Sequence, residues 1–274
     1  MGMQVNTNIS ALNSYRNLSN TQNDLAKSLE KLSSGLRINH AADDAAGLAI
    51  SQGLQSQVGG LTVASRNAQD GISVIQTAEG SLSEVQTILQ RVRDLAVQSG
   101  NDSNNTDSRA AIQTEVTALA AELTRISTSA NFNGTKLANG ATTLTFQVGA
   151  GSVAADDQIA VTTTNVGAIA TAVGALTFTS SATALTSIAA VDAQITAVST
   201  ARADLGAQQN RFESVIRNLA VSTENLTAAK SRITDTDMAS EMVKYTRSNI
   251  LSQAGTAMLA QANQGNQGVL QLLR

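Results

Sequence analysis

Apolar residues recur along the chain at alternating spacings of three and four, which is the pattern of helices that pack side by side. Near the N-terminus this pattern passes through Ala11, Tyr15, Leu18, Gln22, Leu25, Leu29, Leu32 and Leu36. A second, longer pattern passes through Leu61, Ala64, Ala68, Gly71, Ile75, Ala78, Leu82, Val85, Leu89, Val92 and Ala96. A helix from about Ala45 to the end of this pattern is ~80 Å long at about 1.5 Å per residue.

Two more helical patterns follow a polar segment. The run SGNDSNNTDS, residues 99–108, predicts a short loop between antiparallel neighbours. The third pattern passes through Ile112, Val116, Leu119, Leu123, Ile126 and Ala130. The fourth passes through Ile188, Val191, Ile195, Val198, Arg202, Leu205, Gln209, Phe212, Ile216 and Leu219. A break at residues 231–237 then precedes a last helical segment, rich in Ala and Gln, that extends to Arg274.

The middle of the chain, residues 131–182, has a different composition. It is rich in Thr, Val, Ala and Gly, and it contains the turn dipeptides Asn133–Gly134 and Asn139–Gly140. The segments TTLTFQVGA and QIAVTTTNV are typical of short strands in hairpins. The sequence therefore predicts a mainly α fold: a long antiparallel helical bundle or coiled coil with a small β-hairpin region in the middle.

Composition strengthens this prediction and excludes several kinds of site. The 274 residues include no Pro and no Cys, and 2% are aromatic. Without Pro the helices have no forced kink, and without Cys there are no disulfides, thiolate metal sites or cysteine nucleophiles. The net charge of −3 comes from well-mixed residues, so we expect no nucleic-acid partner. No window is apolar enough to span a membrane, and the N-terminus lacks the features of a cleaved secretory signal.

The stretch SSGLRINHAADDAAGLAI, residues 33–50, gathers the residues with the most chemical potential. It holds Arg37, Asp43, Asp44 and His40, the one histidine of the chain. These residues are compatible with a metal or acid–base site, or with the end of one helix and the start of the next. A lone His without a second His or Cys is a poor metal site, and Asp is a frequent helix cap. We therefore expect a structural hinge, no cofactor, no metal and no enzymatic activity.

Several motifs in this order resemble the bacterial flagellins, the subunits of the flagellar filament. These motifs are MQVNTNISAL, SSGLRINHAADDAAGLAIS, LQRVRDLAVQSGN, NFNGTKL and the segment from SRITDTDMASEMVKYTRSNIL to the end of the chain. The resemblance covers about residues 3–137 and 183–274. It implies a structural protein that is exported through the flagellar type III pathway, forms an extracellular filament and serves swimming motility.

The resemblance also implies a domain organisation. Residues 1–42 with 236–274 correspond to D0, the inner core of terminal helices, and residues 43–235 correspond to D1, a helical bundle that includes the hairpin region. The middle is too short for an outer D2 or D3 domain. The hinge between D0 and D1 is expected at Gly35, Arg37, Asn39, Asp43, Asp44, Asp235 and Asp237.

The two ends of the chain are uncharged, which suits tight packing between copies. Residues 1–15 and 248–273 contain no charged side chain, and a buried unpaired charge is costly. We expect these ends to fold against each other and against other copies, with a polymerisation core of Leu18, Leu25, Leu29, Leu32, Ile250, Leu251, Met258, Leu259, Val269, Leu270, Leu272 and Leu273. The alternative is a hook–filament junction protein, which has similar ends. A signalling coiled coil is disfavoured by the Gly- and Thr-rich middle.

The resemblance implies further partners: flagellar cap, junction and export-chaperone proteins, and a host toll-like receptor. The residues that align with the receptor-recognition surface of flagellins are Gln90, Arg91, Leu95, Gln98 and Glu115. Arg91 and Leu95 have the i, i+4 spacing of one helix face. The alternative is that Arg91 is a solvated charge and Leu95 a packing residue.

Overall fold

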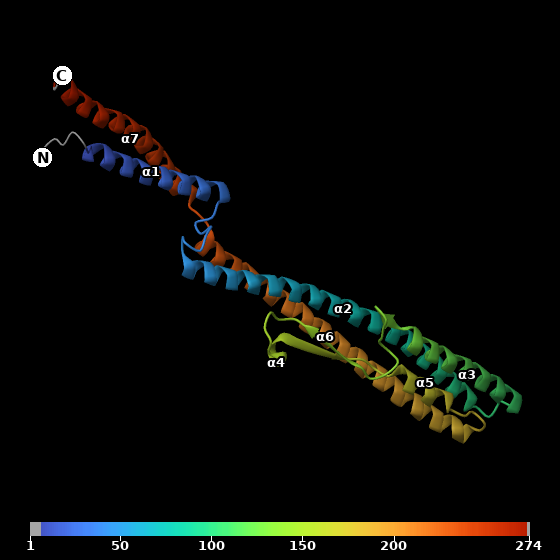
Figure 1. Ribbon diagram of the computed structural model, residues 1–274. Coiled ribbons are helices and arrows are strands. Elements are labelled where there is room, and N and C mark those ends of the chain that lie inside the picture. Colours follow the sequence, from blue (N-terminus) through green and yellow to red (C-terminus); the bar gives the residue numbers. More distant parts are fainter. Residues whose placement is uncertain (1–6, 273–274) are drawn as a thin grey trace. The chain divides into compact units, whose positions relative to one another are not determined.

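The computed structural model describes residues 7–272 of the chain, and the side chains of residues 7–264. The chain divides into two compact units. We call Met1–Ser56 with Asn225–Arg274 the terminal unit and Gln57–Glu224 the central unit. Figure 1 shows that long helices dominate both units and that the short strands all belong to the central one. This is the mainly α fold with a small β-hairpin region that the sequence predicts. Within the described residues, no helix is long and apolar enough to cross a membrane.

The core of the central unit lies along α2 (Ala45–Ser99), which contributes residues to both units. The predicted pattern of this helix is confirmed, because every position from Ala64 onward is buried. The buried residues are Ala64, Ala68, Gly71, Ile75, Ala78, Leu82, Val85, Leu89, Val92, Ala96 and Ser99. We call this row the α2 seam.

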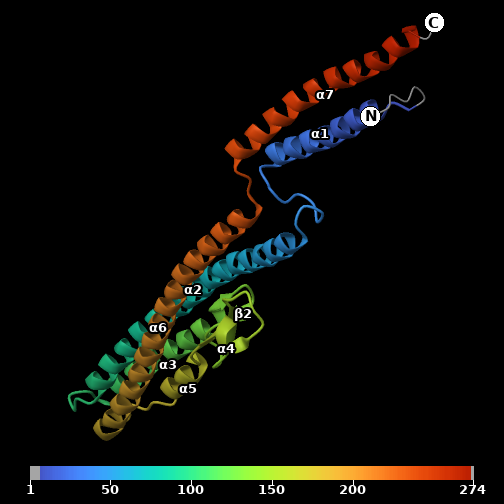
Figure 2. The ribbon, with the colours of Figure 1, turned by 90° about the vertical axis from the view of Figure 1, so that its left-hand side faces the viewer.

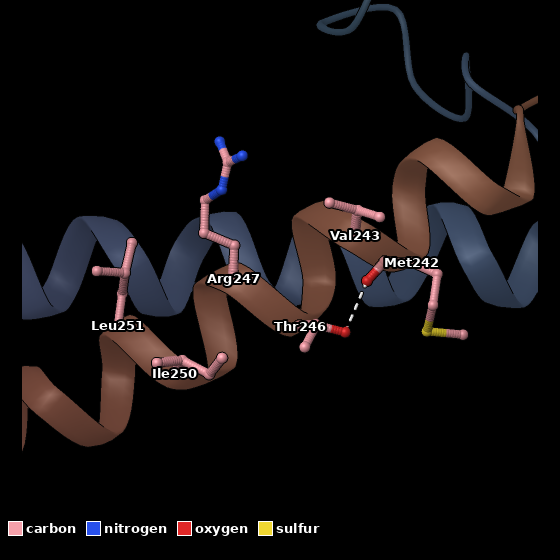
Figure 3. Close-up of a pocket in the computed structure, with 6 residues that line it drawn as sticks. All are labelled: Met242, Val243, Thr246, Arg247, Ile250 and Leu251. Carbon is pink, nitrogen blue, oxygen red and sulfur yellow. Dashed lines mark hydrogen bonds between the residues drawn. The ribbon is translucent and has the colours of Figure 1, made fainter.

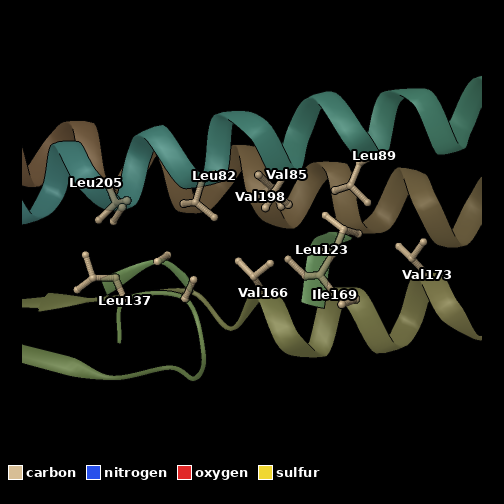
Figure 4. Close-up of a cluster of buried hydrophobic side chains, with 14 of the residues drawn as sticks. Leu82, Val85, Leu89, Leu123, Leu137, Val166, Ile169, Val173, Val198 and Leu205 are labelled. Carbon is tan, nitrogen blue, oxygen red and sulfur yellow. The ribbon is translucent and has the colours of Figure 1, made fainter. Parts of the chain in front are cut away.

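The helix α6 (Ser181–Thr234) packs against the α2 seam with a row of buried apolar residues, one in every heptad. These residues are Ala184, Val191, Val198, Leu205, Phe212 and Leu219. Phe212 sits directly over Gly71, where an added Cβ would lie 2.9 Å from the ring. Figure 4 shows side chains of α2 and α6 meeting those of the third helix α3 (Thr106–Ser129) and of the segment that follows it.

Helix ends follow the local chemistry that the sequence predicts. The first helix, α1 (Ile9–Ser34), begins at Asn8, whose side chain accepts a hydrogen bond from the Ala11 amide. It ends at Gly35, which has a left-handed backbone with φ 74°. Asn105 caps α3 in the same way as Asn8 caps α1, and the polar loop before it is where the sequence places it.

Two antiparallel hairpins form in the middle of the chain. Strands β1 (Asn131–Phe132) and β2 (Thr135–Lys136) are joined by Asn133 and Gly134, whose φ values of 48° and 83° suit a tight two-residue turn. Strands β3 (Thr143–Gln147) and β4 (Gln158–Thr162) pair around a longer connection that holds α4 (Ala154–Asp157).

The sequence predicts a β-hairpin region at residues 131–182, but this segment also contains helix beyond the short α4. A helix, α5 (Val166–Gly174), lies within it. Asn165 caps its start, and Val166, Ile169, Ala170 and Val173 form a buried face that packs against α3. Nine residues are too few for helical spacing to stand out from the surrounding Val- and Thr-rich strands.

The packing of Phe212 gives a test of this core. Its ring is fully buried and meets the ring of Phe146 edge to face, with the ring centroids 5.6 Å apart. We expect Phe212→Ala to lower the free energy of unfolding of the central unit by about 3–5 kcal/mol, because it removes a large side chain from a site that cannot fully collapse. Chemical denaturation measures this loss. Val221→Ala, at an exposed position of α6, is the control and changes stability by less than about 0.5 kcal/mol. A loss below about 1 kcal/mol in Phe212→Ala contradicts this packing.

Candidate assembly surface

The terminal unit is built on two antiparallel helices, α1 and α7 (Met238–Leu272). Figures 1 and 2 both show them side by side. Among the residues whose side chains are described, two hydrogen bonds cross between them: Asn8 Nδ2 donates to the Ala262 carbonyl at 2.9 Å, and Ser28 Oγ donates to Glu241 Oε1 at 2.7 Å. These two contacts lie near opposite ends of the pair and fix its register.

The face that α1 turns toward α7 differs from the predicted one. Its buried and half-buried residues are Ala11, Ser14, Leu18, Thr21, Leu25, Ser28 and Leu32. Tyr15 and Leu29, which the sequence placed in this row, are 63% and 54% exposed. Small side chains at one position of each heptad let the helices approach closely, and the larger neighbours are left outside. The predicted row was therefore one residue off at every second position.

The helix α7 turns a face of mainly small or polar residues toward α1. The residues on this face are Glu241, Tyr245, Ser248, Ser252, Gly255, Leu259 and Ala262. The two helices approach each other closely at Gly255, where an added Cβ would lie 3.1 Å from Leu18 Cδ1. The contact between the two helices thus buries little large apolar surface.

The remaining surface of α7 carries exposed apolar residues, of which Leu251 and Met258 also line a hollow beside Leu18 of α1. Met242, Val243, Ile250, Leu251 and Met258 are each between 51% and 62% exposed. Figure 3 shows four of them with Thr246 and Arg247 around a shallow hollow on this helix. On α1, Ile9, Leu12, Tyr15 and Leu29 are also exposed. We call these two sets together the outer apolar face.

The structure divides the predicted polymerisation core between the two faces. Leu18, Leu25, Leu32 and Leu259 lie between α1 and α7 of the same chain. Leu29, Ile250, Leu251 and Met258 belong to the outer apolar face. Val269, Leu270, Leu272 and Leu273 lie outside the residues whose side chains are described.

The predicted hinge residues lie in the two segments that connect helices, one between α1 and α2 and the other between α6 and α7. Backbone hydrogen bonds join these two segments. Leu36 and Asp235 form a single antiparallel β-bridge. On one side of it the Arg37 amide donates to the Thr234 carbonyl at 2.6 Å, and on the other the Thr236 amide donates to the Gly35 carbonyl at 3.0 Å. We call this arrangement the clasp.

The Arg37 side chain strengthens the clasp. Its Nη2 and Nε donate to the Ile233 carbonyl at 2.7 and 3.2 Å. This carbonyl lies in the last turn of α6, where free acceptors and the helix dipole favour a cation.

Among the acidic residues of the hinge, Asp43 holds the loop between α1 and α2, and Asp44 and Asp237 stand at helix starts. Asp43 accepts hydrogen bonds from the amides of His40 and Asn39, which hold the pKa of its carboxyl below the usual range. Asp44 accepts from the Gly47 amide at 2.8 Å, and Asp237 accepts from the first amides of α7.

Asp235 of the hinge and the neighbouring His40 are also bonded locally. Asp235 accepts from the hydroxyls of Ser231 and Thr234, and its pKa is lowered for that reason. His40 lies 2.7 Å from Glu30. Among the described residues no three His, Cys, Asp or Glu side chains gather in a way that could hold a metal ion.

Sequence reasoning missed the buried carboxylate of Glu241. Its residue is 5% exposed, between Ser28 of α1 and Lys244 of α7. Burial raises its pKa, but hydrogen bonds from Ser28 and Lys244 and the charges of Lys244 and Lys31 outweigh burial, so the pKa lies below the usual value. The sequence contained a signal for this burial. The spacing of four and three residues that connects Leu259, Gly255 and Ser252 extends back to Glu241, which places Glu241 on the face toward α1.

The residues aligned with the receptor surface fall into two groups. Arg91 Nη2 lies 2.7 Å from Glu115 Oε1, which ties α2 to α3 with side chains 56% and 42% exposed. Gln90 and Gln98 are also exposed. Leu95 is 2% exposed and belongs to the core. Arg91 and Leu95 differ by about 40° around the helix and straddle the edge of the buried row, so Leu95 is a packing residue, which is the alternative that the sequence left open.

Comparison with known proteins places these features in a family. Residues 5–143 match the bacterial flagellin N-terminal helical region, and residues 188–273 match the bacterial flagellin C-terminal helical region. A flagellin of Halalkalibacterium halodurans is 52% identical over 273 residues, covering 99% of this chain and 100% of that protein. The flagellin of Bacillus subtilis is 47% identical over 308 residues with the same coverage.

A solved structure supports the same assignment. The crystal structure of Bacillus cereus flagellin aligns with a TM-score of 0.50 at 30% identity, covering 60% of this chain and 94% of that one. The match of both helical regions and of full-length relatives shows that the chain belongs to the bacterial flagellins, the structural subunits of the extracellular flagellar filament, which are not enzymes.

Proposed function

We propose that this subunit joins the filament through its outer apolar face and that the filament serves swimming motility. The observation that carries the proposal is the orientation of α7. This helix presents small and polar residues to α1 and leaves large apolar side chains, such as Ile250 and Met258, in solvent. An exposed apolar row of this size is stabilised when another surface covers it.

Other copies of the chain are the occupants that fit this face. Residues 248–264 carry no charge, so a second helix can cover them without burying an unpaired ion. Contacts between unlike surfaces of successive copies do not close into a dimer and instead extend into a helical tube. This agrees with the membership of the chain in a family of filament subunits.

The ends of the chain are proposed to become ordered at the growing tip. Of the 26 residues of α1, Leu18 and Ser28 alone are buried. Such a contact provides little free energy against the conformational entropy of ordering two long segments. Ordering therefore depends on contacts with neighbouring subunits, which restricts it to the filament end.

We further propose that residues 1–42 with 236–274 act as the inner core D0 and residues 43–235 as D1. The clasp, the loop contact of Asp43 and the caps formed by Asp44 and Asp237 would then join the two parts. The clasp joins the segment that follows α1 to the segment that precedes α7, so α1 and α7 are expected to become ordered together.

Export in an unfolded state through the flagellar type III channel suits the composition of the chain. The absence of Cys excludes disulfides that would block threading. The absence of Pro removes slow cis–trans isomerisation from refolding at the tip. Cap, junction and export-chaperone proteins are the partners that this route implies. The hook–filament junction role remains the alternative.

Recognition by a host toll-like receptor is proposed for the exposed group around Arg91. Its members are Gln90, Arg91, Gln98 and Glu115. Because Leu95 is buried, it would support this surface and not contact the receptor. Arg91 would exchange its contact with Glu115 for contacts with the receptor.

The outer apolar face can be tested by one added charge. We expect Ile250→Glu to slow seeded elongation more than about tenfold, because an unpaired charge buried at a subunit contact costs several kcal/mol. Electron microscopy measures filament length, and circular dichroism measures the gain of helix on assembly. Val221→Glu, at an exposed apolar position of the central unit, is the control and elongates normally. Normal filaments from Ile250→Glu would refute the proposed surface. Wild-type chains that never elongate on seeds would favour the junction role.

The buried carboxylate makes the terminal pair sensitive to acid. Because the folded pKa of Glu241 lies below its usual value of 4.5, its contribution to stability is complete above that value and is lost as pH falls through the folded pKa. Wild-type filaments should therefore dissociate as pH falls below about 4.5. Glu241→Gln should be less stable at neutral pH and show a smaller change between pH 7 and pH 3. Pelleting measures the assembled fraction. Glu84→Gln, at an exposed site of α2, serves as the control, and an identical pH profile for Glu241→Gln contradicts the prediction.

The receptor proposal is best tested without disturbing the core. We expect Arg91→Ala to reduce receptor signalling by monomers about tenfold or more, while thermal unfolding stays close to that of the wild type, because an exposed ion pair contributes less than about 1 kcal/mol. A cell reporter assay measures signalling. Arg125→Ala removes another exposed arginine, paired with Glu122 on α3, and leaves signalling unchanged. Full signalling by Arg91→Ala rejects the proposal.

A further inference from the structure

The apolar contact between α2 and α6 in the central unit does not define its own register. The α2 seam repeats Ala, Leu, Ile or Val at nearly every position, and the buried row of α6 has one apolar residue in every seven. Sliding one helix past the other by seven residues would place apolar side chains against apolar side chains again. Such repetitive seams need other groups to select a single alignment.

A polar layer interrupts this repetition at Arg202. The second row of α6 that faces the core has Ile188, Ile195 and Ile216 at three of its heptad positions, but Arg202 and Gln209 between them. Arg202 Nη1 donates to Gln86 Oε1 at 2.6 Å, and Nη2 donates to Glu79 Oε1 at 3.3 Å. Its guanidinium thus lies between two α2 residues that are one heptad apart.

Neither alternative register preserves these contacts. A shift of seven residues in one direction would place Arg202 beside Gln86 and Arg93, which brings two positive charges together. A shift in the other direction would place it beside Ile72 and Glu79, with an apolar side chain where Gln86 now accepts a hydrogen bond. In either case Arg202 loses one of its two acceptors.

Two other contacts agree with the observed register. Arg93 Nε lies 2.6 Å from Asp192 Oδ1, and a shift would replace Arg93 by Gly100 or Gln86. Phe212 needs the missing Cβ of Gly71, and a shift would put its ring against Ala78 or Ala64. The polar layer and the steric fit therefore select the same alignment.

From these contacts we infer that Arg202 is a positioning residue that sets the register of α2 against α6. The energetic cost of burying part of this charged side chain supports the role. The Arg202 side chain is 32% exposed, and its Nε is buried without a hydrogen-bond partner in the part of the chain that the structure describes. An apolar residue of similar size would fill this position without that cost, so the arginine contributes specificity more than stability.

The register can be measured in the monomeric chain, independently of assembly. The chain has no Cys, so Thr77→Cys and Thr186→Cys introduce the only two sites for spin labels. Both positions are exposed and lie far apart along the helix pair, so a slip of one heptad changes their axial offset by about 10 Å. Pulsed electron paramagnetic resonance then reports the register as a distance.

We expect one narrow distance in the otherwise wild-type chain and a second population, displaced by about 10 Å, in Arg202→Met. Arg217→Met, at an exposed position of the same helix, is the matched control and keeps one distance. One narrow, unshifted distance in Arg202→Met would overturn the inference.

A charge exchange covers the case in which a substitution at this site prevents folding. Arg202→Glu places two carboxylates together and should disturb the register or the fold, as seen by the same distance and by circular dichroism. Combining it with Glu79→Arg restores an ion pair in the observed alignment and should recover the wild-type distance. A double variant that folds but does not recover the wild-type distance would also overturn the inference.

Discussion

The unbroken seam of α2 is the constraint on which the central unit depends. From Ala64 to Ser99 every third or fourth residue is buried, and α3, α5, α6 and both hairpins find their packing partners along this row. A seam of this length is possible because the chain has no Pro to interrupt it. The core is made almost entirely of Ala, Leu, Val and Ile, which interlock between parallel axes where few aromatic rings would fit.

The same helical spacing gives a different result in the terminal unit. There the contact between α1 and α7 is lined by Ser, Thr, Gly and a few Leu, and the larger apolar residues point outward. A helix pair of this kind is incomplete as a folded unit, because it buries too little apolar surface to offset the loss of conformational entropy. That incompleteness is what a subunit needs if its ends are to fold only within an assembly.

Polar groups define the geometry that apolar contacts leave open. Hydrophobic burial has no direction, so it permits helices to slide and rotate. Arg37 holds the segment after α1 against the end of α6. Glu241 and Ser28 fix one end of the α1–α7 pair, and Arg202 lies within the contact between α2 and α6. Glu241 and Arg202 would be costly to bury alone, and Arg37, Glu241 and Arg202 each have a partner on an element distant in the sequence.

The sequence by itself determined the long helices, the breaks near Gly35 and Asp235, the turn at Asn133–Gly134 and the family, because these depend on local spacing, on capping residues and on motifs. The tertiary structure alone decided which of two adjacent rows of α1 faces α7 and that Leu95 is buried beside exposed Arg91. The physical reason is that two neighbouring rows on a helix share half of their positions and differ by one residue at the others, so the spacing of apolar residues fits both rows. The shape of the partner, such as the space left by Gly255 for Leu18, selects between them.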